Sequence, residues 1–430
     1  MSREDKLAKK RSLLSQEQWA ILEQKLKGNP ATVLASKVDQ EKTALTKASL
    51  SSLEPQDALD IDWSSLVEAG CHSARQIPED LSLADYIAFN QQLDQLCLVS
   101  LCVALRGWNI FVQAGERHTV DELMTHLAIL PSFRKLLYRW LLELSSAGFL
   151  GQEEDTFVSF QPLPVESPVT PFIEEGGLHK KICAAIPSIV TGKKHMLEYI
   201  FAEGQADNAE KGYEQIAVSR YFNDIAAKII ATVVEKLPAG RQLRILEIGA
   251  GVGGTTSSLL SLLPPDRTVY AFTDLSSYFL DHARKKFANY PFVYYDLLDI
   301  DQDPVHAGFQ PHSFDMVIGA NVMHCARFLP KTLQYMRSLL NSDGLLLLLE
   351  LTQNAPRHTV FPGLLEGFSH FEDERLQWNK PLLPPVQWEK FLCSGGFKEF
   401  AAFPEANHPA EVLGEHVMIA QIAPEILKTS

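Results

Sequence analysis

The sequence lacks the long apolar segments that membrane proteins and secreted precursors need. No run approaches the roughly 18 apolar residues of a transmembrane helix. The opening stretch, MSREDKLAKK, has no apolar core of the kind that a signal peptide contains. We therefore expect a cytoplasmic protein with no membrane partner.

Cysteine pairs and net positive charge are absent as well. The six cysteines include no C-x-x-C pair, so the sequence predicts buried thiols and neither a metal site nor a disulfide framework. The net charge of -14 argues against a nucleic-acid-binding protein. At 430 residues, with 46% hydrophobic and 21% charged side chains, the chain is long enough for two or three globular domains.

The amino-terminal half is predicted to be mainly helical. A short amphipathic helix at 12–27, capped by Ser15, either packs on its own protein or docks to a larger assembly, and a polar linker follows it. Two helices and a small hairpin, a winged-helix pattern, come next; few basic residues lie on the second helix, which favours packing or dimerisation over DNA binding. The predicted divisions of the chain are 1–60, 61–165, 166–238 and 239–430.

The most informative stretch is LRILEIGAGVGGTTSSLL, residues 243–260. Four apolar residues and an acid lead into a glycine-rich turn containing Gly249, Gly251 and Gly253, and a helix follows. A buried strand that enters such a turn is typical of sites for nucleotide-like ligands. The acid, Glu247, is poorly placed beside a pyrophosphate but suits a ligand that carries an ammonium and a sulfonium. S-adenosylmethionine is such a ligand.

Later strands also end in polar side chains. The pattern predicts strands alternating with helices, and therefore an α/β fold with a mostly parallel sheet. Ligands of such sheets lie at the carboxyl ends of the strands. The polar residues at these ends are Asp274, Asp299, Asn321, His324 and Glu350.

From residue 243 to about 400 the chain resembles the methyltransferase domains embedded in polyketide synthases. The blocks that carry the resemblance are LEIGAGVGGTT, YAFTDLS, DIDQDP with GFQPHSFDMVIGANVMHCAR, LLLLELT, and LLPPVQWEKFLCSGGF, in that order. The resemblance implies a class I methyltransferase with a Rossmann-like sheet, preceded by a helical lid. The chain begins with its own Met and contains no ketosynthase, reductase or carrier segment, so we expect either a stand-alone protein acting in trans or an excised domain.

The resemblance also implies roles for single residues. Glu247, Gly249, Gly251 and Gly253 would hold the methionine end of S-adenosylmethionine, Asp274 its ribose and Asp299 its adenine, with Asn321 also on the donor side. His324 would be the general base and Glu350 would orient it, a pairing that suits a neutral imidazole near working pH. Asp274 and Asp299 could instead be turn or cap residues. If His324 only shapes the pocket, Tyr213 and Tyr221 are the next candidates for the base.

The activity implied is methylation of the α-carbon of a β-ketoacyl thioester on an acyl carrier protein, within or beside a polyketide synthase or hybrid megasynthase. The alternatives are O-methylation of such a chain, an inactive methyltransferase-like module, a small-molecule methyltransferase, or a DNA-binding regulator. Three basic clusters, at 179–181, 192–195 and 284–286, either attract the acidic carrier protein or are solvated helix faces.

Overall fold

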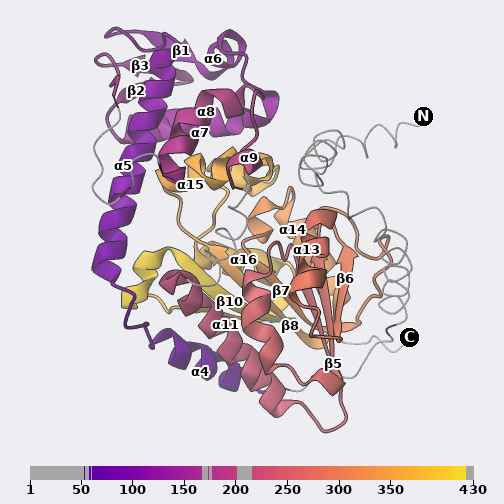
Figure 1. Ribbon diagram of the computed structural model, residues 1–430. Coiled ribbons are helices and arrows are strands. Elements are labelled where there is room, and N and C mark those ends of the chain that lie inside the picture. Colours follow the sequence, from indigo (N-terminus) through magenta and orange to yellow (C-terminus); the bar gives the residue numbers. More distant parts are fainter. Residues whose placement is uncertain are drawn as a thin grey trace, which may run out of the picture.

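The computed structural model describes residues 53, 58–59, 61–166, 173, 177–200 and 216–422. The helix predicted at 12–27, nearly all of its linker, and Tyr213 lie outside these residues. Within them the molecule has two bodies: a large sheet flanked by helices, and a helical body above it that we call the lid (Figure 1).

The large body is built on a seven-stranded sheet of order β6-β5-β4-β7-β8-β10-β9. Strands β4 to β8 pair in parallel with one another, and β10 runs antiparallel to β8 and β9. This confirms the mostly parallel sheet of the predicted fold class. The strands are β4 (Leu243–Ile248), β5 (Thr268–Asp274), β6 (Val293–Leu297), β7 (Phe314–Ala320), β8 (Leu340–Leu351), β9 (Phe397–Phe403) and β10 (Glu415–Ile422).

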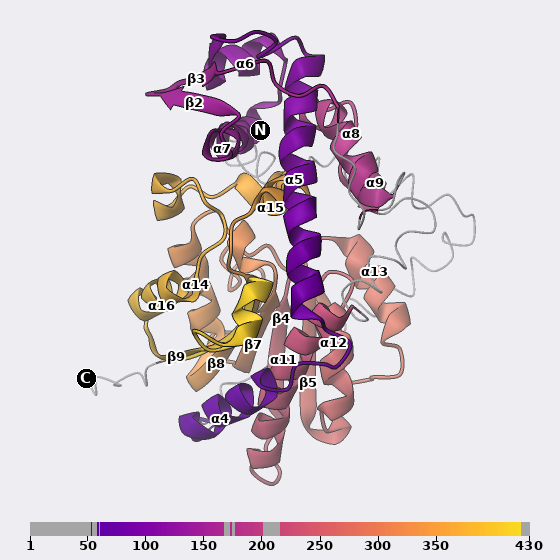
Figure 2. The same ribbon diagram turned by 90° about the vertical axis from the view of Figure 1, so that its left-hand side faces the viewer.

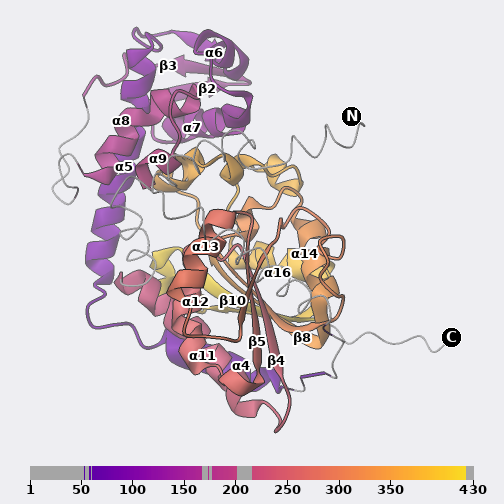
Figure 3. The ribbon, with the colours of Figure 1, turned by 45° about the vertical axis from the view of Figure 1, so that its right-hand side comes forward.

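Helices cover both faces of this sheet, which is why its central strands are apolar on both sides. Figure 3 shows α4, α11, α12 and α13 beside one face and α14 and α16 beside the other. Each face has its own buried hydrophobic cluster. The helices are α4 (Trp63–Ala74), α11 (Ala217–Lys236), α12 (Gly254–Leu259), α13 (Ser277–Lys286), α14 (Leu329–Leu339) and α16 (Pro385–Ser394).

The lid contains the predicted pair of helices and hairpin. Thr119 caps α6 (Val120–His126) in a capping box with Glu122, and α7 (Arg134–Ser146) follows a 3-10 turn. A small sheet of order β1-β3-β2 completes the unit. Its strands are β1 (Arg117–Thr119), β2 (Leu150–Glu153) and β3 (Thr156–Ser159), and the helices α8 (Leu178–Val190) and α9 (Leu197–Ile200) pack beside it.

One long helix, α5 (Leu83–Gly107), joins the two bodies. Figure 2 shows it rising from the sheet into the lid. Near its start the Tyr86 hydroxyl donates to the carbonyl of Leu413, 3.1 Å away, and its second half packs in the lid core. None of the described helices is both long and apolar enough to cross a membrane.

The two bodies do not follow the predicted divisions of the chain. Helix α4, expected with the lid, packs on the sheet through Leu66. Conversely α15 (Pro356–Val360), from the carboxyl-terminal division, enters the lid core. The Arg357 guanidinium lies 2.6 Å from the Asp94 carboxylate of α5, and Trp140 donates its indole N–H to the Thr359 carbonyl at 3.2 Å. The segment after β8 therefore ties the lid to the sheet.

The six cysteines are free thiols. Three of them, Cys97, Cys102 and Cys183, are buried as expected, whereas Cys393 is exposed. Its position on the outer side of α16 explains this difference, because the apolar residues of that helix, Trp388 and Leu392, take the inner side.

Candidate active site

The glycine loop has the backbone shape that only glycine adopts without strain. Gly249, Gly251 and Gly253 have φ angles of 56°, 54° and 73°. A β-carbon at Gly249 would lie 2.3 Å from Val322, and one at Gly253 would lie 2.7 Å from Phe287. At Gly251 a β-carbon would meet no atom of the described residues within 4 Å. The first and third glycines therefore permit close packing, and the middle one exposes its backbone to open space where a ligand can approach.

Glu247 lies at the end of β4 with its side chain buried. Its Oε2 accepts hydrogen bonds from the Thr256 hydroxyl at 2.6 Å and the Tyr270 hydroxyl at 2.8 Å. Burial raises the pKa of Glu247 to about 7, although both hydroxyl bonds oppose the rise. A nearby cation would stabilise the ionised carboxylate, which is the property that an ammonium-bearing ligand needs.

Asp274 lies at the end of β5 and joins that strand to the glycine loop. Its Oδ2 accepts the amide of Gly251 at 2.9 Å, and its Oδ1 accepts the amide of Ser276 at 2.8 Å. Burial raises its pKa to about 6 against these two bonds. The hydroxyl of Ser276 is buried with no hydrogen-bond partner among the described residues. An orphaned hydroxyl beside a strand-end carboxylate fits a ligand that brings hydroxyl groups of its own.

Asp299 and Asn321 are held by the protein itself. The Asp299 carboxylate accepts the amide of Asp301 at 3.0 Å and the side-chain amide of Gln302 at 2.8 Å, in a turn after β6. Asn321 donates to Oε1 of Glu415 at 2.8 Å and accepts the amide of Leu351 at 3.0 Å. Asn321 thus fastens the end of β7 to β8 and β10. Donor contacts for either residue remain predictions.

The residues predicted as catalytic are adjacent. His324 lies in a 3-10 turn, η5 (Met323–Cys325), after β7, and its Nδ1 lies 2.6 Å from Oε2 of Glu350 on β8. The other oxygen of Glu350 accepts the amides of Val322 at 3.0 Å and Met323 at 2.7 Å. One carboxylate therefore holds both the ring and the turn that carries it.

Electrostatics make this imidazole a strong base. Both side chains are buried, with exposed fractions of 6% for His324 and 0% for Glu350. Burial opposes protonation of the ring, but the adjoining groups of Cys325 and Glu350 outweigh it and raise the pKa of His324 well above its usual range. With Nδ1 engaged by Glu350, Nε2 is the nitrogen left for a substrate proton.

Two further groups near the dyad were missed from the sequence. Glu415, at the start of β10, bonds Asn321, and burial raises its pKa to about 7. Arg375 donates to the carbonyl of His324 at 2.8 Å. Neither stands at the carboxyl end of a parallel strand, so the strand-end rule could not find them. Among the described residues no group of three or more His, Cys, Asp or Glu side chains is arranged to bind a metal.

The alternative base Tyr221 lies in the hydrophobic core, and two of the basic clusters lie at the glycine loop and on the lid. Tyr221 is buried in the core of the sheet domain, and its hydroxyl donates to the carbonyl of Ala74 at 2.7 Å. Lys286 donates to the carbonyl of Val252 in the glycine loop at 3.0 Å, so part of the 284–286 cluster supports the loop. Lys181 is exposed on α8 of the lid.

Comparison with known proteins agrees with this geometry. A methyltransferase domain family matches residues 246–346. The polyketide synthase ThaQ of Burkholderia thailandensis is 34% identical over 353 residues, which are 76% of this chain and 17% of ThaQ. The solved CurJ carbon methyltransferase is 30% identical with a TM-score of 0.77, over 83% of this chain and 99% of that one. The solved DszA carbon methyltransferase is 25% identical with a TM-score of 0.72, over 87% of this chain and 99% of that one.

The sheet order, the glycine loop after the first parallel strand and the acid after the second define a class I S-adenosylmethionine-dependent methyltransferase. Within that class, the chain belongs to the methyltransferases of polyketide synthases. Its methyl donor is S-adenosylmethionine. Among the described residues, no atom would meet a β-carbon at Gly251 and none bonds the hydroxyl of Ser276, which fits such a ligand.

Proposed function

We propose that this protein methylates the α-carbon of a β-ketoacyl thioester carried on the phosphopantetheine arm of an acyl carrier protein. The observation that carries the proposal is the buried pair of His324 and Glu350, with Nδ1 and Oε2 2.6 Å apart. The likeness to two carbon methyltransferases, at 30% and 25% identity, supports carbon as the acceptor atom. The likeness to synthase chains supports a carrier-bound substrate.

In this proposal Glu247, the loop around Gly251, and Asp274 hold the donor, with Asp299 and Asn321 as further predicted donor contacts. When bound, S-adenosylmethionine supplies an electrophilic methyl group on a positively charged sulfur. Glu247 lies buried one residue before the end of β4, where its carboxylate can pair with an ammonium. Asp274 offers carboxylate oxygens to hydroxyl groups, and Ser276 offers a buried hydroxyl that has no partner in the part of the chain that the structure describes.

His324 acts on the acceptor. Nε2 of the neutral ring takes the proton from the α-carbon, and the electron pair of that C–H bond becomes the enolate. The enolate carbon would form the new carbon–carbon bond to the methyl group as the methyl–sulfur bond breaks, its electron pair staying on sulfur, which leaves as a neutral thioether. Glu350 accepts a hydrogen bond from Nδ1–H and stabilises the imidazolium that results. Because the charge develops in a buried pair, its stabilisation is stronger than it would be in water.

The decisive experiment is mass spectrometry of a panel of carrier-bound chains after incubation with the methyl donor. We expect a single added methyl group on an unbranched β-keto chain, with fragmentation placing it on the α-carbon. A β-keto chain with two α-methyl groups has no α-proton and should stay unmethylated. Transfer of methyl to the blocked chain would favour O-methylation instead, and no transfer to any chain would leave an inactive module. His324→Ala serves as the variant without the base.

A further inference from the structure

A buried ion pair, formed by Arg375 and Asp373, contacts the backbone of the turn that carries His324. Arg375, in the 3-10 turn η8 (Glu374–Gln377), is 0% exposed, and Asp373 is 4% exposed. The guanidinium Nε donates to Oδ1 of Asp373 at 2.8 Å and Nη2 donates to Oδ2 at 2.7 Å. This fork-to-fork geometry fixes the plane of the guanidinium. Burying such a pair is costly unless its remaining donors are also used.

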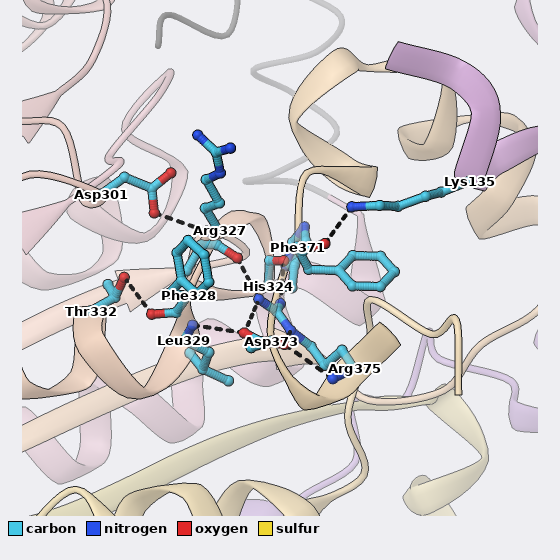
Figure 4. A network of polar contacts seen from close by, with 11 residues as sticks. Lys135, Asp301, His324, Arg327, Phe328, Leu329, Thr332, Phe371, Asp373 and Arg375 are labelled. Carbon is cyan, nitrogen blue, oxygen red and sulfur yellow. Dashed lines mark hydrogen bonds and ion pairs between the residues drawn. The ribbon is translucent and has the colours of Figure 1, made fainter. Parts of the chain in front are cut away.

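The remaining donors of Arg375 reach the backbone of the His324 turn. Nη1 donates to the carbonyl of His324 at 2.8 Å, and Nη2 donates to the carbonyl of Ala326. These two carbonyls flank Cys325, so the guanidinium spans the turn from one side to the other. Figure 4 shows Asp373, Arg375 and His324 in this network. Glu350 holds the same turn through the amides of Val322 and Met323.

The segment that carries Arg375 also contacts the ring of His324 and the lid. Phe368 packs edge-on against the imidazole, with ring centroids 5.4 Å apart. The ring of Phe371 lies 5.3 Å from the Arg375 guanidinium and 4.9 Å from Nζ of Lys135 on α7. Lys135 also donates to the carbonyl of Phe371. The backbone of His324 is thus held from the segment that touches the lid.

We propose that Arg375, oriented by Asp373, is a positioning residue that holds His324 so that its Nδ1 meets Glu350 and its Nε2 faces the acceptor. The inference rests on the proposed function of His324 as the base. A lysine cannot replace the guanidinium, because a single ammonium cannot bind a carboxylate bidentately and reach both carbonyls in one plane. A displacement of the base by about 1 Å costs about 10² in rate.

The test compares Arg375→Lys with Arg241→Lys. Arg241 forms the matched control pair, because its Nη2 lies 2.7 Å from the buried carboxylate of Asp315, which lies at the amino end of β7. For Arg375→Lys we expect kcat to fall about 10²-fold while the acceptor KM and donor Kd change less than about twofold. The acid limb of the kcat profile should move to lower pH, because a ring displaced from Glu350 loses part of the rise in its pKa. Arg241→Lys should lower the unfolding midpoint without either effect.

A second measurement keeps the inference testable if Arg375→Lys folds poorly. Asp373→Asn leaves Arg375 in place but removes the charge that orients it. It should therefore also lower kcat and move the acid limb to lower pH, but by less than Arg375→Lys does. Imidazole nitrogen signals, with that of His324 assigned by its loss in His324→Ala, should titrate at lower pH in both variants. An unchanged His324 signal and unchanged kcat would overturn the inference. Full turnover in His324→Ala would overturn the proposed function instead, while the imidazole signal still reports whether Arg375 positions the ring.

Discussion

The amide of Gly251 donates a hydrogen bond of 2.9 Å to Oδ2 of Asp274. The loop after β4 and the carboxylate at the end of β5 are therefore one unit, and a change in the loop also disturbs the acid. Ala250 adds a second link, because its amide donates to the carbonyl of Thr273 at 3.0 Å.

Gly251→Val should weaken donor binding strongly. A β-branched side chain at a φ of 54° is strained, and it projects into the open space beside the loop. Gly240→Val is the control, because Gly240 also has a positive φ, 78°, and also faces open space, but it precedes β4 at the opposite end of the sheet. Both variants should lose similar stability, and calorimetry should detect a lower donor affinity only in Gly251→Val. Unchanged affinity there would remove the donor from this loop.

The His324 and Glu350 pair should behave as one functional unit. His324→Ala should lower turnover about 10² to 10⁴-fold with donor affinity nearly unchanged, because the pair acts on the acceptor proton. Glu350→Gln should cost less because the ring remains, but it should still lower turnover, since its one amide oxygen cannot accept both the amides of Val322 and Met323 and Nδ1 of His324. The double variant should be far from additive. His312→Ala is a control, because that ring bonds the carbonyl of Leu340 at the other end of β7. The dyad would be contradicted if the turnover losses of the two single variants multiplied in the double variant, or if His324→Ala lost its affinity for the donor.

The parallel core of this fold was predictable because each strand is a short apolar run between turns. The strands that escaped prediction are β9 and β10, whose antiparallel pairing with β8 depends on partners far along the chain. Strand β8 also begins at Leu340, before the apolar run that starts at Gly344, because Leu340 pairs with Phe314. Local pattern cannot reveal such an extension.

In the candidate site, too, the residues at strand ends were predictable from local sequence, whereas those brought in from distant parts of the chain were not. His324 and Glu350 stand at neighbouring strand ends, so the rule for parallel sheets brings them together. Glu415 is 94 residues from Asn321 in sequence, and Arg375 is 51 residues from His324. Their contacts depend on how the segment after β8 returns to the sheet, which no local spacing encodes.

Stability should depend on pH through Glu247. Its pKa is about 7 in the folded protein and 4.5 as the ordinary value, so the folded state binds the extra proton between these values. Stability should therefore fall as pH rises from about 4.5 to 7. Burial raises the pKa values of Asp274 and Glu415 to about 6 and about 7, so these carboxyls add to the same slope. Glu247→Gln should therefore remove only the share that belongs to Glu247, while a neutral amide oxygen can still accept both hydroxyl bonds. Thermal unfolding across this pH range provides the measurement, and an unchanged slope would contradict the assignment.

The same carboxylate should make donor binding depend on pH. An ammonium beside Glu247 favours its ionised form, so binding should release protons near pH 7 and donor affinity should rise through that range. Calorimetry in buffers of different ionisation enthalpy measures the released protons. Glu247→Gln should abolish the release and weaken binding most above pH 7. Equal proton release by the variant would place the donor's ammonium elsewhere.

The basic cluster at 179–181 should matter only for carrier-bound substrates. Lys181 is exposed on α8, and Lys180 is half-buried beside it; if they attract an acidic carrier protein, reversing both to Glu should slow methylation of the carrier-bound chain. A short pantetheine thioester has no protein to attract, so its rate should change little.

The control is reversal of Lys228 and Lys236 on α11, both exposed. It makes the same change of charge on the other body and should leave the methylation rates of both substrates unchanged. The difference between substrates should shrink as salt rises, since exposed charges are screened over about 8 Å at physiological ionic strength. Equal losses on the two substrates would assign these lysines to a solvated helix face.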